Sequence, residues 1–193
     1  MKPTRSVPPA REPYTAYRAE LRADFNGCCG YCDDSDHGVD KIGFHIDHFA
    51  PKVRFPTLTC IYTNLVYACR FCNIHKSNKW TGADAASHHD GSKGFIDPCS
   101  NVYDQHLERN DEGRIVGKTN LGRYIATQLN LGLLRHQLLW KARRARALRD
   151  EIPLLLQRYK AAGIPDDKLY ISLLERFVEL QQKIERYEHV AHG

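Results

Sequence analysis

Two pairs of cysteines with the same spacing are the residues best suited to bind a metal. Cys29 and Cys32 form the first Cys-x-x-Cys pair, and Cys69 and Cys72 form the second. Each pair places two thiolates on one tight turn, and a tetrahedral ion needs two such turns that face each other. The spacing therefore predicts a structural Zn²⁺ site. The chain has seven cysteines, and this odd number fits zinc thiolates in a reducing compartment better than a framework of disulfides.

Three residues near these pairs could hydrolyse a phosphodiester. Asp47 and His48 are adjacent and lie between the pairs, and Asn73 directly follows the second pair. The reaction needs a cation that stabilises the leaving oxygen and a general base that activates water. Asp47 and Asn73 offer hard oxygen ligands and are predicted to hold Mg²⁺ or Mn²⁺. His48 is the candidate base, because imidazole titrates near neutral pH, and Asn64 is the candidate for fixing its tautomer.

The elements that position these residues follow from periodicity and turn residues. A helix is expected from Tyr14 to Asn26, since its apolar residues repeat every four positions and Gly27 follows. Phe44 to Phe49 alternates as a short strand would, and Cys60 to Tyr62 is either a return strand or the approach to a turn. Neighbouring side chains of a regular strand point to opposite faces, so joint use of Asp47 and His48 requires a local irregularity.

The rest of the chain is expected to turn helical after a stretch of loops and short strands. The fold class is α+β, with a zinc-stapled core, an N-terminal helix and a C-terminal α-helical region. The helices are expected from Cys72 to Trp80, from Thr119 or Asn120 to Leu131, from Leu133 to about Ala162 with a kink or break at Pro153, and from Asp166 to about His189. The predicted division is a proline-rich arm (1–13) that is extended rather than packed, a stapled domain (14–118) and a helical region (119–193).

Positive charge near the site and in the last third of the chain could bind a polyanion. The formal net charge is +5, which permits such binding without requiring it. The candidate nucleic-acid contacts are Lys52, Lys76 and Lys79 near the site and Arg143, Arg144 and Arg146 in the densest basic run. For that run a solvated helix face is the competing interpretation. With no apolar stretch long enough for a membrane span and no secretory signal, the expected location is cytoplasmic.

Residues 28–80 resemble the HNH endonuclease superfamily. The matching motifs are Asp47-His48 with Pro51, Asn64-Leu65, and Cys69 to Lys76. The resemblance implies a ββα-metal core in which Asp47 and Asn73 bind the catalytic cation, His48 is the general base and Asn64 orients it. His45 also precedes the motif, but the Asp-His-x-x-Pro register favours His48.

Further motifs are similar to those of PtuB-like HNH proteins of the Septu and retron anti-phage systems, in which the nuclease works beside an ATPase. These motifs are Asp47 to Lys52, Lys93 to Cys99, Gly113 to Ile115 and Leu129 to Leu131. The resemblance implies cleavage of DNA in antiviral defence and an ATPase partner that docks on the C-terminal helices. A homodimer is a further expectation, because two copies would cut both strands.

Two other functions compete with an active nuclease. One is a zinc-stapled nucleic-acid-binding or adaptor module without turnover, and the other is a nuclease that stays silent until an ATPase partner activates it. The sequence leaves open the choice between DNA and RNA, between duplex and single strand, the specificity and the oligomeric state. It also leaves open whether His45 or His75 joins the metal site.

Overall fold

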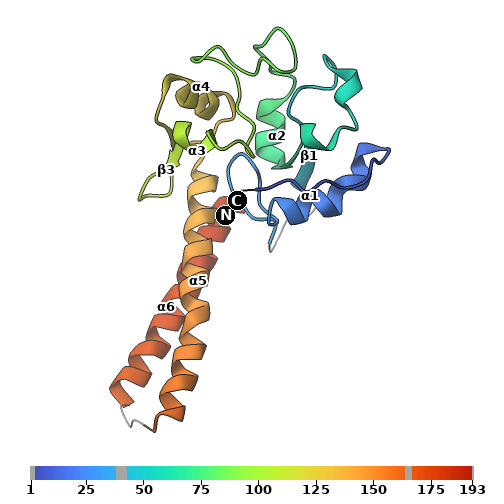
Figure 1. Ribbon diagram of the computed structural model, residues 1–193. Coiled ribbons are helices and arrows are strands. Elements are labelled where there is room, and N and C mark those ends of the chain that lie inside the picture. Colours follow the sequence, from blue (N-terminus) through green and yellow to red (C-terminus); the bar gives the residue numbers. More distant parts are fainter. Residues whose placement is uncertain (1–2, 38–42, 164–166, 193) are drawn as a thin grey trace. The chain divides into compact units, whose positions relative to one another are not determined.

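The computed structural model describes residues 3–37, 43–163 and 167–192 (Figure 1). It combines helices with small antiparallel sheets, which confirms the predicted α+β class. The chain divides into two compact units, Met1–Leu133 and Leu134–Gly193. The first unit thus includes the predicted arm and also residues 119–133 of the predicted helical region. Outside the described residues lie 1–2 of that arm, 38–42, and Asp166, at which the last helix was expected to start.

The first unit begins with a short 3-10 helix that leads into an α-helix. The predicted helix from Tyr14 to Asn26 is present as η1 (Tyr14–Tyr17) and α1 (Arg18–Asp24). It ends where Asn26 and Gly27 both adopt positive φ, at 55° and 65°. Glycine adopts this conformation without strain, so Gly27 serves as the expected stop.

A ββα motif lies at the centre of the first unit. It consists of β1 (Phe44–His48), β2 (Leu65–Cys69) and α2 (Arg70–Lys76). The strands are antiparallel, and their register pairs Asp47 with Val66 and His48 with Leu65. The segment before β2 is the turn η4 (Tyr62–Asn64), so the second of the two expectations for Cys60 to Tyr62 is confirmed. The connection between the strands also contains the short helix η3 (Pro56–Leu58).

The proline-rich arm is extended but is anchored to the core through Arg5. The Arg5 guanidinium donates hydrogen bonds to the Leu65 carbonyl at 3.1 and 3.0 Å from Nε and Nη2. Its Nη1 forms an ion pair with Asp97 at 2.6 Å. The arm therefore packs on the end of β2, whereas composition alone predicted a segment without packing.

A second hairpin and a helix complete the first unit. The elements are α3 (Tyr103–His106), β3 (Leu107–Arg109), β4 (Ile115–Gly117) and α4 (Asn120–Gln128). The Thr119 hydroxyl caps α4 by accepting a hydrogen bond from the Gly122 amide at 3.0 Å. A Cβ on Gly122 would lie 1.8 Å from the carbonyl oxygen of His106, the last residue of α3, so only glycine allows α4 to approach the end of α3 this closely.

The second unit consists of two long helices, α5 (Leu134–Ala161) and α6 (Asp167–His192), which run side by side in Figure 1. Their shared core contains Ala145, Ile152, Leu180 and Ile184. Pro153 lies inside α5 but does not end it, so of the predicted kink or break the break is absent. No helix of the described residues is long and apolar enough to cross a membrane.

Candidate active site

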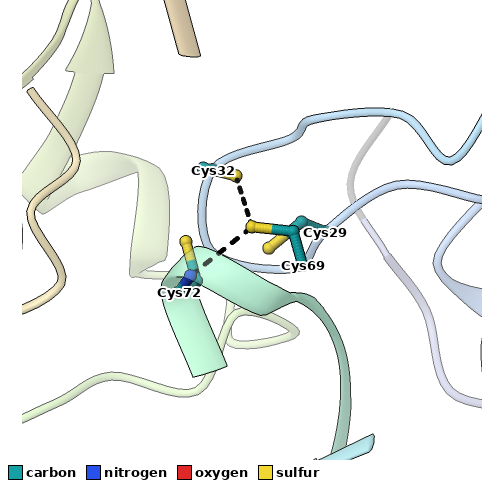
Figure 2. A group of neighbouring side chains, drawn as sticks. All are labelled: Cys29, Cys32, Cys69 and Cys72. Atoms are coloured by element: carbon teal, nitrogen blue, oxygen red, sulfur yellow. Dashed lines mark hydrogen bonds between the residues drawn. The ribbon is translucent and has the colours of Figure 1, made fainter. Parts of the chain in front are cut away.

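The four predicted zinc ligands converge at one end of the ββα motif. Figure 2 shows Cys29 and Cys32 on a loop opposite Cys69, at the end of β2, and Cys72, on the first turn of α2. All four are buried, and their sulfur atoms lie within 4.8 Å of one another. Cys69 also caps α2, since its sulfur accepts a hydrogen bond from the Cys72 amide at 3.5 Å.

The spacing of the sulfurs fits a tetrahedral zinc site. A Zn–S bond of about 2.3 Å places the sulfurs of such a site about 3.8 Å apart. The Cys32 and Cys69 sulfurs are separated by 3.7 Å. Hydrogen bonds from the neighbouring thiols, that of Cys29 first, lower the pKa of Cys69, while burial raises the pKa of Cys32. A cation that binds all four as thiolates resolves this competition, so the cluster fits a zinc staple.

Asp47, His48 and Asn73 line one open pocket of about 450 Å³. Asp47 and His48 come from the end of β1, and Asn73 comes from α2. His48 is the last residue of β1, where the alternation of the strand ends, and this allows two neighbouring side chains to face the same pocket. The remaining lining residues include Tyr14, His45, Ile46, Pro51, Lys52, Ile74, Ser77 and Asn78.

The Asp47 carboxylate is buried and hydrogen-bonded. Burial raises the pKa of Asp47 to about 6, although the charge of Lys76 and a hydrogen bond from Tyr31 both lower it. The Tyr31 hydroxyl donates to Oδ2 of Asp47 at 2.6 Å. At neutral pH the carboxylate is therefore mostly ionised and can ligate a cation.

His48 is held in one tautomer by a main-chain carbonyl. Its Nε2 lies 3.0 Å from the Thr59 carbonyl oxygen. Because a carbonyl only accepts, Nε2 carries the proton and Nδ1 carries the lone pair. Burial lowers the pKa of His48; the hydrogen bond to Thr59 acts in the opposite direction, and the nearby lysine charges lower the pKa further. The ring is thus neutral near pH 7 and able to accept a proton.

Asn64 supports the pocket through the neighbouring loop rather than through the His48 imidazole. Its Oδ1 accepts a hydrogen bond from the Ala50 amide at 2.8 Å, and its Nδ2 donates to the carbonyls of Ala50 and Leu58 at 3.0 and 3.2 Å. Its own carbonyl accepts from the Phe49 amide. The predicted partner of His48 is therefore replaced by Thr59. Asn64 instead holds the loop in which Thr59 lies.

Lys76 does not contact solvent, and the prediction that it holds phosphates is wrong. The residue has 0% exposure, and its Nζ donates to the Phe49 carbonyl at 2.8 Å. Its ammonium lies 5.0 Å from the ring centre of Phe95 and 5.8 Å from that of Trp80. Burial lowers the pKa of Lys76, and the carboxylate of Asp47 opposes that shift. The ammonium is an internal charge behind the pocket.

The other basic candidates are accessible in varying degree. Lys52 is exposed at the edge of the pocket, with its ammonium 5.1 Å from the Tyr14 ring centre. Lys79 donates to the Gln128 carbonyl at 3.0 Å. In the second unit Arg144 is exposed and stacks over Trp140, Arg146 pairs with Glu188, and Arg143 is half-buried.

The two remaining histidines near the motif differ in position. His45 is exposed and lines the pocket. His75 points elsewhere: its Nδ1 donates to the Phe71 carbonyl at 2.7 Å, and its Nε2 lies 3.5 Å from the Asn130 amide. Within the described part of the chain, His45 is therefore the histidine near enough to His48 to share its pocket.

Two residues that hold the site were missed by the sequence analysis. Tyr31 lies inside the first Cys-x-x-Cys pair, where its hydroxyl could have been recognised as a donor. Thr59 acts through its main-chain carbonyl, and no side-chain pattern signals such a contact.

Comparison with known proteins supports the same motif. The model of the HNH endonuclease family matches residues 29–79. The chain is 29% identical over 130 residues to the Septu protein PtuB of Bacillus mycoides (strain KBAB4). This match covers 53% of the chain and 43% of PtuB, so it spans less than half of that relative. No solved structure matches the chain. The resemblance inferred from the sequence is confirmed.

Proposed function

Because residues 29–79 carry an HNH endonuclease domain, we propose that the protein is a metal-dependent endonuclease that hydrolyses phosphodiester bonds in DNA. One observation carries the proposal. A buried carboxylate, a neutral imidazole and an amide, from Asp47, His48 and Asn73, line the same open pocket. A module that only binds nucleic acid does not need a general base beside a hard-metal ligand.

The residues divide the reaction between them. His48 takes a proton from water at Nδ1, because the Thr59 carbonyl keeps the other proton on Nε2. The lowered pKa of His48 keeps Nδ1 unprotonated before the reaction. Lys52 lies at the rim of the pocket, where it contacts a backbone phosphate.

Asp47 and Asn73 hold the catalytic cation, for which their hard oxygen donors select Mg²⁺ or Mn²⁺. When bound, such a cation stabilises the charge that develops on the leaving oxygen. The thiolates of the staple select the softer Zn²⁺, so two metals with separate tasks fit the two donor sets.

The proposal extends to antiviral defence and to a partner. Its support is the similarity to a Septu protein and to PtuB-like HNH proteins that work beside an ATPase. The C-terminal helices α5 and α6 are the proposed docking element for that ATPase. The exposed Arg144 beside Trp140 adds a proposed contact with DNA. Homodimerisation is the proposed route to double-strand cuts.

The first test is plasmid cleavage by wild type and His48→Ala, with EDTA, Mg²⁺ or Mn²⁺ and with zinc measured on both proteins. We expect divalent-dependent nicking or linearisation that falls by about 10²- to 10⁴-fold in His48→Ala, the range for losing a general base. His45→Ala is the matched control, because it removes an imidazole from the same strand and pocket and should retain cleavage.

Three other results would change the assignment. Equal activity of wild type and His48→Ala would refute the role of His48. DNA binding without cleavage by either protein would favour the binding module. Cleavage that appears only after addition of an ATPase from the same defence system would identify a gated nuclease, which shares the chemistry but not the regulation.

A further inference from the structure

The zinc-binding turn reaches directly into the candidate active site through Tyr31. Tyr31 lies between Cys29 and Cys32, and its hydroxyl donates a hydrogen bond of 2.6 Å to Oδ2 of Asp47. The Tyr31 side chain is buried, with 3% exposure, and so is Asp47, with 6%. A charge-assisted bond of this length between buried groups is among the stronger hydrogen bonds in proteins.

The backbone around Tyr31 is fixed on three sides. The cysteines on either side belong to the cluster, and the Gly30 amide donates to the Tyr67 carbonyl of β2 at 2.8 Å. A Cβ on Gly30 would lie 2.6 Å from the Phe25 ring and 2.9 Å from Val66, so the turn lies tightly against the core. The Tyr103 hydroxyl donates to the Tyr31 carbonyl at 3.1 Å. The Tyr31 ring thus has a defined starting point from which to reach Asp47.

This bond constrains the predicted metal ligand. A carboxylate can rotate about its Cβ–Cγ bond, and a rotated carboxylate presents a different oxygen to a cation. Because Oδ2 accepts the hydrogen bond from Tyr31, the Asp47 carboxylate is restrained from rotating and its plane is fixed. Residues that hold a metal ligand in this way commonly change metal affinity or activity by 10- to 100-fold when they are removed.

We propose that Tyr31 is a positioning residue of this site, whose hydroxyl is placed by the zinc-binding turn and orients the Asp47 carboxylate for a divalent cation. The inference rests on the proposed function for the identity of Asp47 as a ligand. It assigns the staple a second task besides holding the fold, because the turn that binds zinc also sets one ligand of the other metal.

The test compares Mn²⁺ binding by wild type, Tyr31→Phe, Tyr67→Phe and Asp47→Ala, using titration calorimetry on proteins whose zinc content is measured. Tyr31→Phe removes only the hydroxyl that reaches Asp47. Tyr67→Phe is matched to it, because it removes another buried tyrosine hydroxyl that donates to a carboxylate, in this case Asp36 at 2.7 Å. We expect about 10-fold weaker Mn²⁺ binding for Tyr31→Phe and a wild-type value for Tyr67→Phe, with zinc retained in both.

A cleavage assay adds a readout that a purely structural role would not change. We expect Tyr31→Phe to need more Mn²⁺ for half-maximal cleavage and to recover rate at high Mn²⁺, with the KM for DNA unchanged. Equal Mn²⁺ affinity in Tyr31→Phe and wild type would overturn the inference. Loss of zinc from Tyr31→Phe would overturn it as well, because the hydroxyl would then serve the staple.

Failure of the proposed function would give a different pattern. Wild type would bind Mn²⁺ in a manner that Asp47→Ala abolishes, yet would not cleave DNA under any condition. The affinity of Tyr31→Phe would still decide the role of Tyr31, because that measurement does not depend on turnover.

Discussion

The ββα motif carries two polar clusters of opposite character. The cysteine cluster is closed: its four residues have exposures of 0 to 3%, and their sulfurs face one another. The pocket of Asp47, His48 and Asn73 is open to solvent and has a volume of about 450 Å³. Helix α2 contributes to both, through Cys72 to the cluster and through Asn73 to the pocket, so their difference arises from the side chains rather than from separate domains.

The comparison shows how one small motif separates stability from chemistry. Structural zinc sites saturate the ion with protein ligands, whereas catalytic metal sites keep a position for water or substrate. The cysteines supply a full tetrahedral set, and the pocket supplies two hard ligands and open space. Substitutions in the cysteine cluster should therefore disturb both the cluster and the pocket, whereas substitutions in the pocket should leave the cluster intact.

The largest effect is expected for Cys72→Ser, which removes a zinc ligand at the start of α2. Zinc binding contributes about 10–16 kcal/mol in small zinc domains, and this free energy is also folding free energy. We expect loss of zinc, a non-cooperative or strongly lowered thermal transition and no cleavage. Zinc analysis and circular dichroism of the same preparation measure the zinc content and the thermal transition, and the plasmid assay measures cleavage.

Cys60→Ser is the control for that variant, because Cys60 is half-buried and lies outside the cluster. It should keep zinc and stability. A Cys72→Ser protein with normal stability would show that the closed cluster does not support the fold, and the contrast between the two regions would no longer hold.

The next effect concerns the loop that supports the open pocket. Asn64→Ala removes three hydrogen bonds to Ala50 and Leu58 from a buried position, which should cost about 3 kcal/mol at about 1 kcal/mol per bond. Cleavage should also fall, because the loop that carries the Thr59 carbonyl loses its support. Denaturant unfolding and cleavage rates measure both, and Thr63→Ala, an exposed neighbour, should change neither.

Asn64 and Thr59 illustrate what the sequence could and could not predict. Metal-ligand spacing is a local property, so the four cysteines were predicted correctly, and the Asp47, His48 and Asn73 set that remains a proposal lines one pocket in the structure. Main-chain groups have no signature in sequence, so Thr59 could not be found. Asn64 was assigned to His48, although its side chain holds the loop instead.

The predictions for Lys76 and for the arm that contains Arg5 were wrong because each rested on local sequence alone. Lys76 was assigned to phosphates because it lies close in sequence to the site residues, and the arm was predicted to be unpacked because it is rich in proline and poor in apolar residues. Their actual partners are the Phe49 carbonyl for Lys76 and Leu65 with Asp97 for Arg5. All of these partners are distant in sequence and meet only after the chain has folded.

A smaller effect on stability alone is expected from Asp36→Asn, beside the zinc-binding turn. Asp36 is 1% exposed and accepts hydrogen bonds from Arg22 at 2.6 and 2.9 Å and from Tyr67 at 2.7 Å. Loss of the charge should cost about 2 kcal/mol, the usual size for hydrogen bonds to a charged group. Zinc content and cleavage should stay unchanged, since Asp36 belongs to neither cluster.

The pH dependence of that difference gives a second readout. Burial tends to raise the pKa of Asp36, but the hydrogen bonds from Arg22 and Tyr67 outweigh it and hold the pKa below its usual value. A lowered pKa in the folded state stabilises the protein above the unfolded pKa of about 3.9, and that contribution is lost as pH falls through the folded pKa. The gap between wild type and Asp36→Asn should thus be constant from pH 5 to 7 and shrink below about pH 4. Asp111→Asn, in an exposed turn, should show no gap at any pH.

The smallest effect is expected at the rim of the open pocket. Lys52→Ala removes an exposed charge that lines the pocket and leaves the cysteine cluster intact. If Lys52 neutralises one phosphate, DNA affinity should fall a few-fold, and the slope of log affinity against log salt should decrease by about 1. Lys93→Ala removes an exposed lysine that is not among the lining residues and should leave the slope unchanged. Fluorescence anisotropy with a labelled duplex at several salt concentrations measures both variants. Equal slopes for the two variants would show that the DNA backbone does not contact Lys52 at this rim. The contribution of the open pocket would then come from Asp47, His48 and Asn73 alone.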